Sequence, residues 1–516
     1  MRLLHAQLAA RHPLPTGGFG ALRDDGVALD AELARANLEV RIAETESGFF
    51  HDRNPALWTG EAIFGCVSLM IRDFAPAAQR VVALRERLSA IPAFLSEMRR
   101  VIAGPVPGLW QQKARRECEA AQQLFGAGLA DWLALTGTAG FTAGFTAGDT
   151  EVTGAREAFS VTASWLDSLG EADASAYSCG EAIMSTLLWR GHFCEEAPRR
   201  LLERATDALV EASVNLVEAL QPFAGSWSAA QAAIAADCAN ADEYYGTFAR
   251  RWREIREGVM SRDVVTWPDW PIRYVPIPEW ARIVAPQLYW LFYRSPAPFD
   301  PYDVYDYVVT PIDSAMSLEM QRARLSAWNH STITLNHVVH HGGVGHHVQN
   351  WHARFRSTSR IGTVAAVDAA SRIGMFLGGS MAEGWACYAT RLAEELGLLS
   401  PLETISERHT SVRLVARAIV DLRLHLGDWS FDECVQFYES TVKMPRDVAL
   451  AETTKNSMFP ATALMYWLGT QGILDLRARH RAALVARFSL RAFHDQLLSR
   501  GAIPVLLASR MMEPST

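Results

Sequence analysis

The chain has 516 residues, and 49% of them are hydrophobic, so it can bury a large core. Its formal net charge of −8 excludes a general electrostatic attraction to nucleic acid or to anionic membranes. The seven cysteines are an odd number and form no Cys-x-x-Cys pair, which favours free thiols in a reducing compartment over a disulfide framework.

Neither a secretion signal nor a membrane span is expected from the sequence. Polar residues interrupt the first eleven positions before an apolar signal-peptide region could form. No uncharged apolar run reaches the roughly 18 to 20 residues that cross a bilayer. We therefore expect a cytoplasmic protein with no nucleic-acid or membrane partner, and the sequence leaves its oligomeric state open.

The first half of the chain is predicted to be helical, because apolar residues recur there at three- and four-residue spacing. Pro92 should kink its helix or start a new one. The small-residue repeat at 138–148 predicts a loop or a close-packed connector. The expected helices are 28–47, 55–72, 76–103, 108–136, 154–169, 174–190, 196–222, 226–240 and 242–260.

Residues 267–311 differ from the rest, because prolines alternate there with tryptophans and tyrosines. The stretch is too rich in proline for one helix and too apolar for disorder, so we expect an ordered segment. It could line a cleft, join two lobes or simply pack in the core. We expect an N-terminal helical lobe over 1–310 and a second lobe over 311–516, packed as one compact unit.

The second half is also predicted to be helical. A helix over 332–341 should loosen at the glycines of 342–345 and continue to about 355. A helix over 380–396 should end at Gly397, a plausible C-cap. Further helices are expected over 402–427, 430–442, 459–478 and 483–499.

Histidines are concentrated in this second half. Six of the fifteen histidines fall within 337–352. Each imidazole nitrogen needs a partner when buried, and imidazole is the commonest metal ligand, so the cluster favours a metal site over a polar loop. Spacing leaves the ligand pair open: His340 and His347 would share a helical face, and so would His337 and His341, whereas His340 and His346 require the helix to loosen.

The segment from His340 to Gln349 resembles the motif His-Glu-Ala-x-Pro-Gly-His-His-Leu-Gln of the bacterial domain-of-unknown-function 885 family, which is similar to all-helical zinc metallopeptidases. The segment that begins with Glu383-Gly384-Trp385 resembles that family's Glu-Gly-Trp-Ala-Leu-Tyr-Ala block. Blocks at 87–95, 417–425 and 460–469 resemble others in the same order. The resemblance implies an all-α, two-lobed, zincin-like fold with a central cleft.

The resemblance also implies one divalent metal, expected to be zinc, held by His340, His346 and Glu383, with His347 as the alternative ligand. Burial beside Trp385 independently favours a compensating cation for Glu383. The chain departs from the family at His341, because the family has at this position the glutamate that is expected to act as general base. His341 could be a base or a further ligand, and a neutral imidazole there leaves the centre one unit more positive, which favours an anionic substrate.

Four further residues are site candidates. Tyr466 and His425 lie in matching blocks and could stabilise an oxyanion or orient the substrate, or could simply be buried and hydrogen-bonded, His425 by Asp421. Arg417 and Lys455 could bind a substrate carboxylate, or form ordinary salt bridges.

These features predict a zinc-dependent hydrolase of an amide or a short peptide-like small substrate, with His341 as general base. Two alternatives remain. One is a metalloenzyme of another class, such as a lyase or dehydratase acting on a small acid. The other is a catalytically silent relative, in which His341 closes the fourth metal position.

Overall fold

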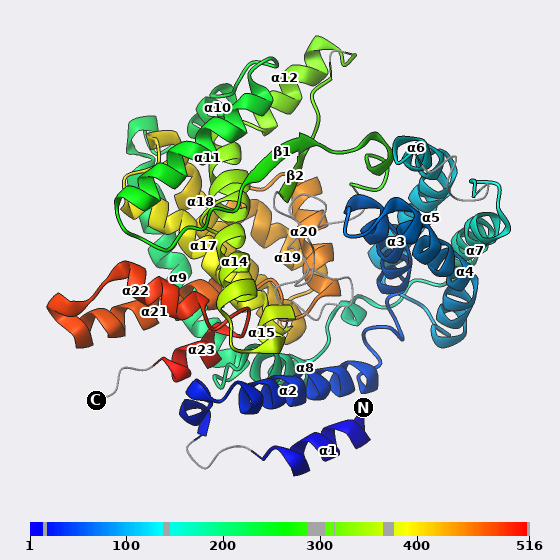
Figure 1. The fold of residues 1–516 in the computed structure, drawn as a ribbon, viewed down its shortest axis with the longest axis horizontal. Helices are drawn as coiled ribbons and strands as arrows, with labels where there is room; N and C mark the ends of the chain where they lie inside the picture. Colours follow the sequence, from blue (N-terminus) through cyan, green and yellow to red (C-terminus); the bar gives the residue numbers. More distant parts are fainter. Residues whose placement is uncertain (14–17, 138–144, 287–304, 314, 365–375, 513–516) are drawn as a thin grey trace.

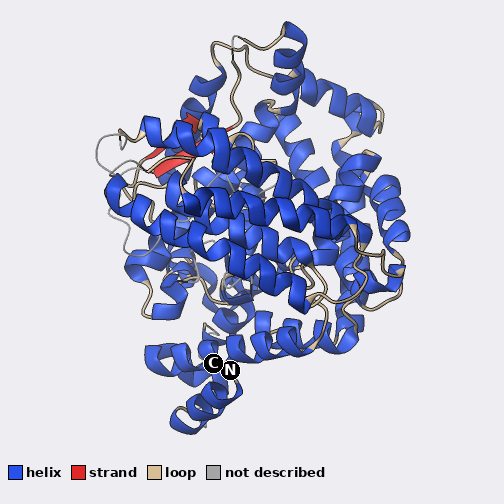
Figure 2. Cartoon of the chain, turned by 90° about the vertical axis from the view of Figure 1, so that its right-hand side faces the viewer, coloured by secondary structure: helices blue, strands red, loops and turns tan. Residues whose placement is uncertain are grey.

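The computed structural model describes residues 1–13, 18–137, 145–286, 305–313, 315–364 and 376–512. The fold is all-α, as predicted: helices fill both views, and the described residues contain one small sheet (Figures 1 and 2). No helix among these residues is long and apolar enough to cross a membrane.

The predicted helices are present, most of them within a few residues of their expected bounds. They are α2 (Gly26–Glu46), α3 (Pro55–Ile71), α4 (Ala77–Val101), α5 (Gly108–Gln123), α6 (Leu129–Leu135), α7 (Thr150–Asp167), α8 (Glu181–Thr186), α9 (Pro198–Ala219), α10 (Trp227–Ala236), α11 (Tyr244–Ser261), α17 (Gly379–Glu395), α18 (Pro401–His425), α19 (Phe431–Phe437), α21 (Met465–Leu484) and α22 (Leu490–Leu498). However, α8, α21 and α22 begin about six or seven residues later than predicted. Gly397 caps α17 with a φ of 67°, as its position predicts.

Several expectations need correction. Pro92 lies inside a single helix, α4, so it does not start a new one. The helix predicted over 108–136 is interrupted by a π-helical turn at Leu124–Gly128. The helix predicted over 459–478 begins only at Met465, because Phe459–Leu464 turn sharply and Ala461 has a φ of 62°. Among the described residues, five α-helices lie wholly outside the predicted ranges: α1 (Arg2–Arg11), α12 (Leu318–Ala327), α15 (Arg360–Val364), α20 (Arg446–Met458) and α23 (Val505–Met511).

The proline-rich segment contains a two-stranded parallel sheet that the prolines concealed. Strand β1 (Ile272–Pro276) pairs with β2 (Tyr305–Val309), with Ile272 opposite Tyr305. Both strands are rich in β-branched and aromatic residues, which suit a pleated surface. The part of this segment at 287–304 lies outside the described residues, as does most of the small-residue repeat, 138–144.

The buried side chains form two large hydrophobic clusters. The first joins α3, α4, α5 and α7 to parts of α18, α19 and α21, and the second joins α2 and α11 to the histidine segment, α17 and the C-terminal helices. Each cluster contains residues from both sides of position 310, so the core is continuous across the expected boundary there. In Figure 1, α3 to α7 stand together at one side of the molecule.

Helices α17 and α21 approach each other backbone to backbone. A Cβ atom at Gly384 would lie 2.5 Å from the carbonyl carbon of Gly469, and one at Gly469 would overlap the carbonyl oxygen of Ser380. Only glycine permits this spacing. The contact fixes Glu383, on α17, relative to Tyr466, at the start of α21.

Candidate metal centre

The histidine segment forms two helices separated by a sharp glycine turn. A π-helical stretch, η8 (Ile333–Gly342), precedes the turn, and α14 (His346–Arg356) follows it. A Cβ atom at Gly345 would overlap the carbonyl oxygen of His340. The predicted loosening is therefore a full break, which allows His340 and His346 to approach although they are six residues apart.

Two indole side chains hold the turn in place. Trp385, on α17, donates to the carbonyl oxygens of Val344 and Gly345 at 2.8 and 3.2 Å. Trp252, on α11, donates to the carbonyl oxygen of Gly342 at 2.6 Å. Because Trp385 lies two residues from Glu383, its bonds set the position of the turn relative to that carboxylate.

Glu383 points between the two predicted histidine ligands. Its Oε2 atom lies 3.3 Å from Nε2 of His340 and 3.6 Å from Nε2 of His346, and all three side chains are largely buried. Among the described residues, Oε2 has no hydrogen-bond partner, because neither contact has hydrogen-bond geometry. The three atoms therefore converge without bonding to one another.

The spacing of these atoms suits a tetrahedral zinc ion. Zinc binds imidazole nitrogen and carboxylate oxygen at about 2.0 to 2.2 Å, so two tetrahedral ligand atoms should be roughly 3.3 to 3.6 Å apart. The two Glu383 contacts fall at these values. Burial lowers the pKa of His340, which favours the neutral imidazole that a metal requires.

His341 lies beside the same three groups. Its ligand nitrogen and those of His340 and His346 lie within 4.8 Å of one another. Its Nδ1–H donates to the carbonyl oxygen of Asn336 at 2.6 Å, which leaves Nε2 with a lone pair. Burial and the neighbouring histidines hold the pKa of His341 well below its usual range, so the ring is neutral near pH 7.

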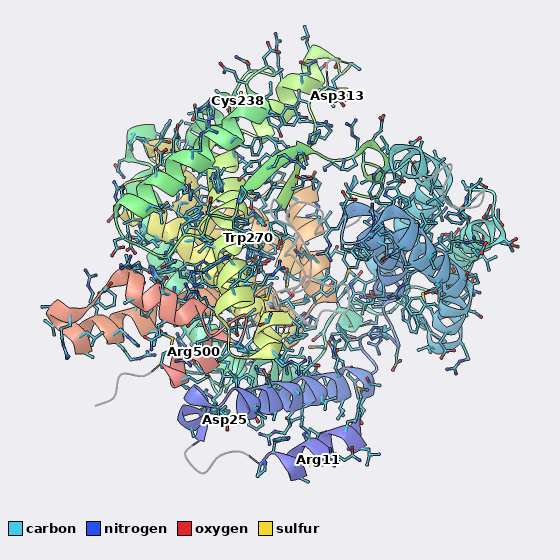
Figure 3. All side chains as sticks on the ribbon, in the orientation of Figure 1. Arg11, Asp25, Cys238, Trp270, Asp313 and Arg500 are labelled. Carbon is cyan, nitrogen blue, oxygen red and sulfur yellow. The ribbon has the colours of Figure 1, made fainter. Side chains whose placement is uncertain are left out.

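His347, the alternative ligand, is directed elsewhere. It is fully buried, stacks on Trp270 and donates from Nε2 to the carbonyl oxygen of Trp270 at 2.6 Å. Figure 3 shows Trp270 near the middle of the molecule, beside α14. His337 is likewise committed, since its Nδ1 lies 2.5 Å from the hydroxyl of Tyr307 on β2. Of the histidines considered from the sequence, the structure therefore brings together His340, His341 and His346.

The two predicted substrate-binding cations lie near the centre but within a charge network. Arg417 pairs through Nε with Glu452 Oε1 at 2.6 Å, and its guanidinium lies 4.4 Å above the ring of Tyr466. Burial raises the pKa of Tyr466, and the negative charge of Glu383 raises it further. Burial lowers the pKa of Lys455, which also lies within range of the Arg417 and Glu383 charges.

His425 is a structural residue in this geometry. It is fully buried, its Nε2 donates to the carbonyl oxygen of Asn456 at 3.1 Å, and its Nδ1 accepts from the amide of Cys179 at 3.3 Å. Both ring nitrogens are therefore occupied, and neither can reach a substrate. Asp421, one turn earlier, accepts from the amides of Ala461 and Leu464 and so shapes the turn before Tyr466.

Three residues with a part in the site were not singled out from the sequence. Cys387 lies one turn after Glu383, and its Sγ is 3.9 Å from Nδ1 of His340. Glu452 is on the unpredicted helix α20, so nothing in the pattern placed it beside Arg417. Trp252 anchors the glycine turn from 90 residues away; only a contact in three dimensions could reveal that role.

Comparison with known proteins supports the sequence resemblance. The model of the family described as "Bacterial protein of unknown function (DUF885)" matches residues 6–512. Among curated proteins, none matches the chain.

Two solved structures share the fold. A candidate lipoprotein of unknown function from Shewanella oneidensis has a TM-score of 0.72 at 19% identity, covering 98% of this chain and 90% of that one. A candidate lipoprotein from Colwellia psychrerythraea has a TM-score of 0.64 at 17% identity, covering 86% of this chain and 77% of that one.

Proposed function

Because this chain belongs to the bacterial DUF885 family, and because its family motifs converge on one point, we propose that it is a metal-dependent hydrolase of an amide or short peptide-like substrate. The metal would be zinc, and His340, His346 and Glu383 would hold it. The proposal includes the two-lobed, zincin-like arrangement, with the site in a cleft between the lobes.

One observation carries the proposal. The buried Oε2 of Glu383 lies 3.3 and 3.6 Å from two imidazole nitrogens without hydrogen bonding to either. A buried carboxylate oxygen that makes no well-formed hydrogen bond is costly, commonly by about 1 to 3 kcal/mol or more for a charged group. A cation at the point where the three atoms meet would remove that cost.

Bound zinc would lower the pKa of a water ligand and polarise a substrate carbonyl. The protein would supply the rest. His341 is neutral, and its Nε2 can accept a proton because Nδ1–H is bound to Asn336. The Tyr466 hydroxyl can donate to a developing oxyanion, since its raised pKa keeps it protonated at neutral pH.

The surrounding charges favour a substrate that carries a carboxylate. With the metal bound, two neutral imidazoles and Glu383 leave the centre at +1, and His341 adds no negative charge. The guanidinium of Arg417 lies over the ring of Tyr466, and Lys455 interacts electrostatically with Arg417 and Glu383, although Glu452 offsets one of the two positive charges. N-acyl amino acids and dipeptides fit this pattern, because a carboxylate adjoins their scissile amide.

One observation favours a second candidate, a catalytically silent metalloprotein. A ring nitrogen of His341 lies within 4.8 Å of ring nitrogens of His340 and His346. If His341 also bound the metal, four protein ligands would close the coordination sphere, and no water would be activated.

Elemental analysis provides the first test. The untagged protein, purified without chelators, should hold about one equivalent of zinc, and Glu383→Gln should hold less than a tenth of that. The exposed-histidine variant His12→Ala is the matched control and should retain the metal. Absence of transition metal from the wild-type protein, together with no uptake of added zinc, would overturn the proposal.

Activity provides the second test. The zinc-loaded protein should hydrolyse members of a panel of dipeptides and N-acyl amino acids, and His341→Ala should lose at least 100-fold in kcat while keeping zinc. If wild type is inactive and His341→Ala binds zinc more weakly, His341 is a ligand, and the silent alternative holds. His341→Glu, which restores the family's residue, should then gain hydrolysis.

A further inference from the structure

The hairpin made by α21 and α22 forms one end of the molecule. In Figure 1 the two helices project at the left-hand edge, at one end of the longest axis. A short 3₁₀ helix, η10 (Val485–Arg487), joins them and forms the tip of the hairpin. Between Asp475 and Asp495 the hairpin contains five arginines and no acidic residue, so this end is positive although the whole chain carries −8.

Most of this positive charge is not offset by acidic side chains. Arg477 is paired with Glu395 at 2.7 Å, and Arg491 is paired with Asp263 at 2.8 Å. The other three arginines are exposed and form no ion pair with any residue that the structure describes: Arg479, Arg481 and Arg487.

The tip between these charges is apolar. Val485 is 74% exposed, the largest fraction among the large hydrophobic side chains of the described residues, and the small apolar residues around it are also exposed. Its φ is 47°, which a β-branched residue rarely adopts, so the turn presents this valine to solvent at a cost in backbone strain. The guanidinium of Arg481 lies 6.0 Å from the centre of the Phe488 ring, which places one of the unpaired charges beside the tip.

An apolar tip flanked by unpaired arginines is complementary to a membrane that contains anionic phospholipids. Apolar side chains are stabilised at the boundary between head groups and acyl chains, and nearby arginines are attracted to the negative surface. The long arginine stem lets the guanidinium stay at head-group level while a neighbouring side chain lies deeper. A nucleic acid would also attract the arginines, but it would leave Val485 in water.

We propose that the tip of the α21–α22 hairpin docks the protein on an anionic phospholipid surface. Val485 would enter the interface, and Arg481 and Arg487, which flank it in the sequence, would bind head-group phosphates. The net charge of −8 excludes a general attraction to such membranes, but it does not describe this end of the molecule. The docking surface is independent of the metal centre, so neither proposal requires the other.

The test is sedimentation of the whole 516-residue chain with lipid vesicles. One set contains phosphatidylcholine alone, and the other also contains about 30% phosphatidylglycerol, which is anionic. The anionic vesicles should bind the protein at least 10-fold more tightly than the neutral ones, and this binding should weaken as salt is added, because salt screens exposed charges.

A double variant tests the arginines. Arg481→Gln with Arg487→Gln should bind anionic vesicles roughly 25-fold more weakly, because each arginine near such a surface contributes about fivefold. The control changes two exposed arginines elsewhere, Arg115→Gln with Arg200→Gln. It alters the net charge equally and should bind as the wild type does.

A second variant tests the apolar contact without a risk to folding. Val485→Gly removes the side chain and relieves the strain at positive φ, so its Tm should be no lower than that of the wild type. It should nevertheless bind anionic vesicles at least fivefold more weakly, because less apolar surface leaves water. The control is Val210→Ala, at a 62% exposed valine between Asp207 and Glu211 on α9, which should bind as the wild type does.

Absence of binding to anionic vesicles at low salt would overturn the proposal, and so would equal binding by the wild type and the arginine double variant. Unchanged affinity of Val485→Gly would contradict insertion of the tip. Tighter binding to duplex DNA than to vesicles, lost in the arginine variant but kept in Val485→Gly, would assign the surface to nucleic acid instead.

Discussion

The glycine contact between α17 and α21 allows a sharp test of how Glu383 is positioned. In Gly384→Ala, the new Cβ would lie 2.5 Å from the carbonyl carbon of Gly469 and 2.9 Å from the amide nitrogen of Thr470. Ordinary carbon contacts are about 3.5 to 4.0 Å, so the helices must separate by roughly 1 Å. These are backbone atoms, which cannot rotate away.

The expected cost follows from two opposing effects. Overpacking typically costs about 1 to 3 kcal/mol, and the upper end applies to rigid backbone. Replacing a helical glycine with alanine recovers about 1 kcal/mol. Gly384→Ala should therefore lose about 2 kcal/mol of unfolding free energy. Gly246→Ala, in α11, is the matched control: its Cβ meets nothing within 4 Å, so it should gain about 0.5 to 1 kcal/mol.

Thermal unfolding and zinc titration measure the two consequences. An unfolding entropy of about 2.1 cal/mol/K per residue gives roughly 1.1 kcal/mol/K for 516 residues, so the two variants should differ in Tm by about 2 to 3 °C. Zinc affinity of Gly384→Ala should fall at least 10-fold, because ligands must be held within about 0.5 Å. Equal Tm values for the variants, or unchanged zinc affinity, would refute this account of the site.

Three further predictions address the ligands and the buried histidines. Zinc at 100 times its Kd contributes roughly 2.7 kcal/mol of binding free energy, so it should raise the Tm of the wild type by about 2 to 3 °C. The control variant Glu395→Gln should show the same rise, and the Tm of Glu383→Gln should not change. Metal analysis should find the zinc lost in His346→Gln but kept in His347→Gln, because His347 bonds to Trp270; zinc loss in both would contradict this assignment. Stability should fall as the pH drops from about 6.5 to 4, by up to about 1.4 kcal/mol per pH unit for each buried histidine, because only the unfolded chain takes up these protons. The histidines concerned are His192, His409 and His425, because burial lowers the pKa of each to about 4. Urea unfolding at pH 7 and pH 5 measures this fall in stability, and equal unfolding midpoints would contradict the prediction.

The sequence predicted the helices best where one face is continuously apolar. Helix α3 begins at Pro55, behind an Asn54 cap, and is found almost as expected. Helix α20 was missed although it places Glu452 beside Arg417. It begins directly after Pro445, and its mean hydropathy is low, so the pattern gave little signal. The strands were missed for another reason: they are short, and each becomes a strand only by pairing across 33 residues.

The site could be predicted in part. The family motifs indicated His340, His346 and Glu383, whereas spacing on an unbroken helix left two pairs open, His340 with His347 and His337 with His341. In the structure His346 approaches His340 because the chain breaks at Gly343–Gly345, and Trp252 and Trp385 hydrogen-bond to the carbonyl oxygens of this turn. Such contacts join residues far apart in sequence, so periodicity cannot reveal them. His425 also lies in a matching block, but in the structure it is fully buried and both of its ring nitrogens are hydrogen-bonded within the protein.

The role of His341 depends on which of its nitrogens is protonated, and the structure constrains this directly. The carbonyl oxygen of Asn336 can only accept, so Nδ1 must carry the proton, and Nε2 must present its lone pair. A lone pair at that position can take a proton or bind a metal, but it cannot donate to a substrate. His341 can therefore replace the family's glutamate as an acceptor while contributing no negative charge. A proton it accepts would add a positive charge to a centre that already contains His340 and His346, whose fields lower its pKa. An anionic substrate held by Arg417 and Lys455 would offset that charge, and for this reason we propose a substrate carboxylate together with a histidine base.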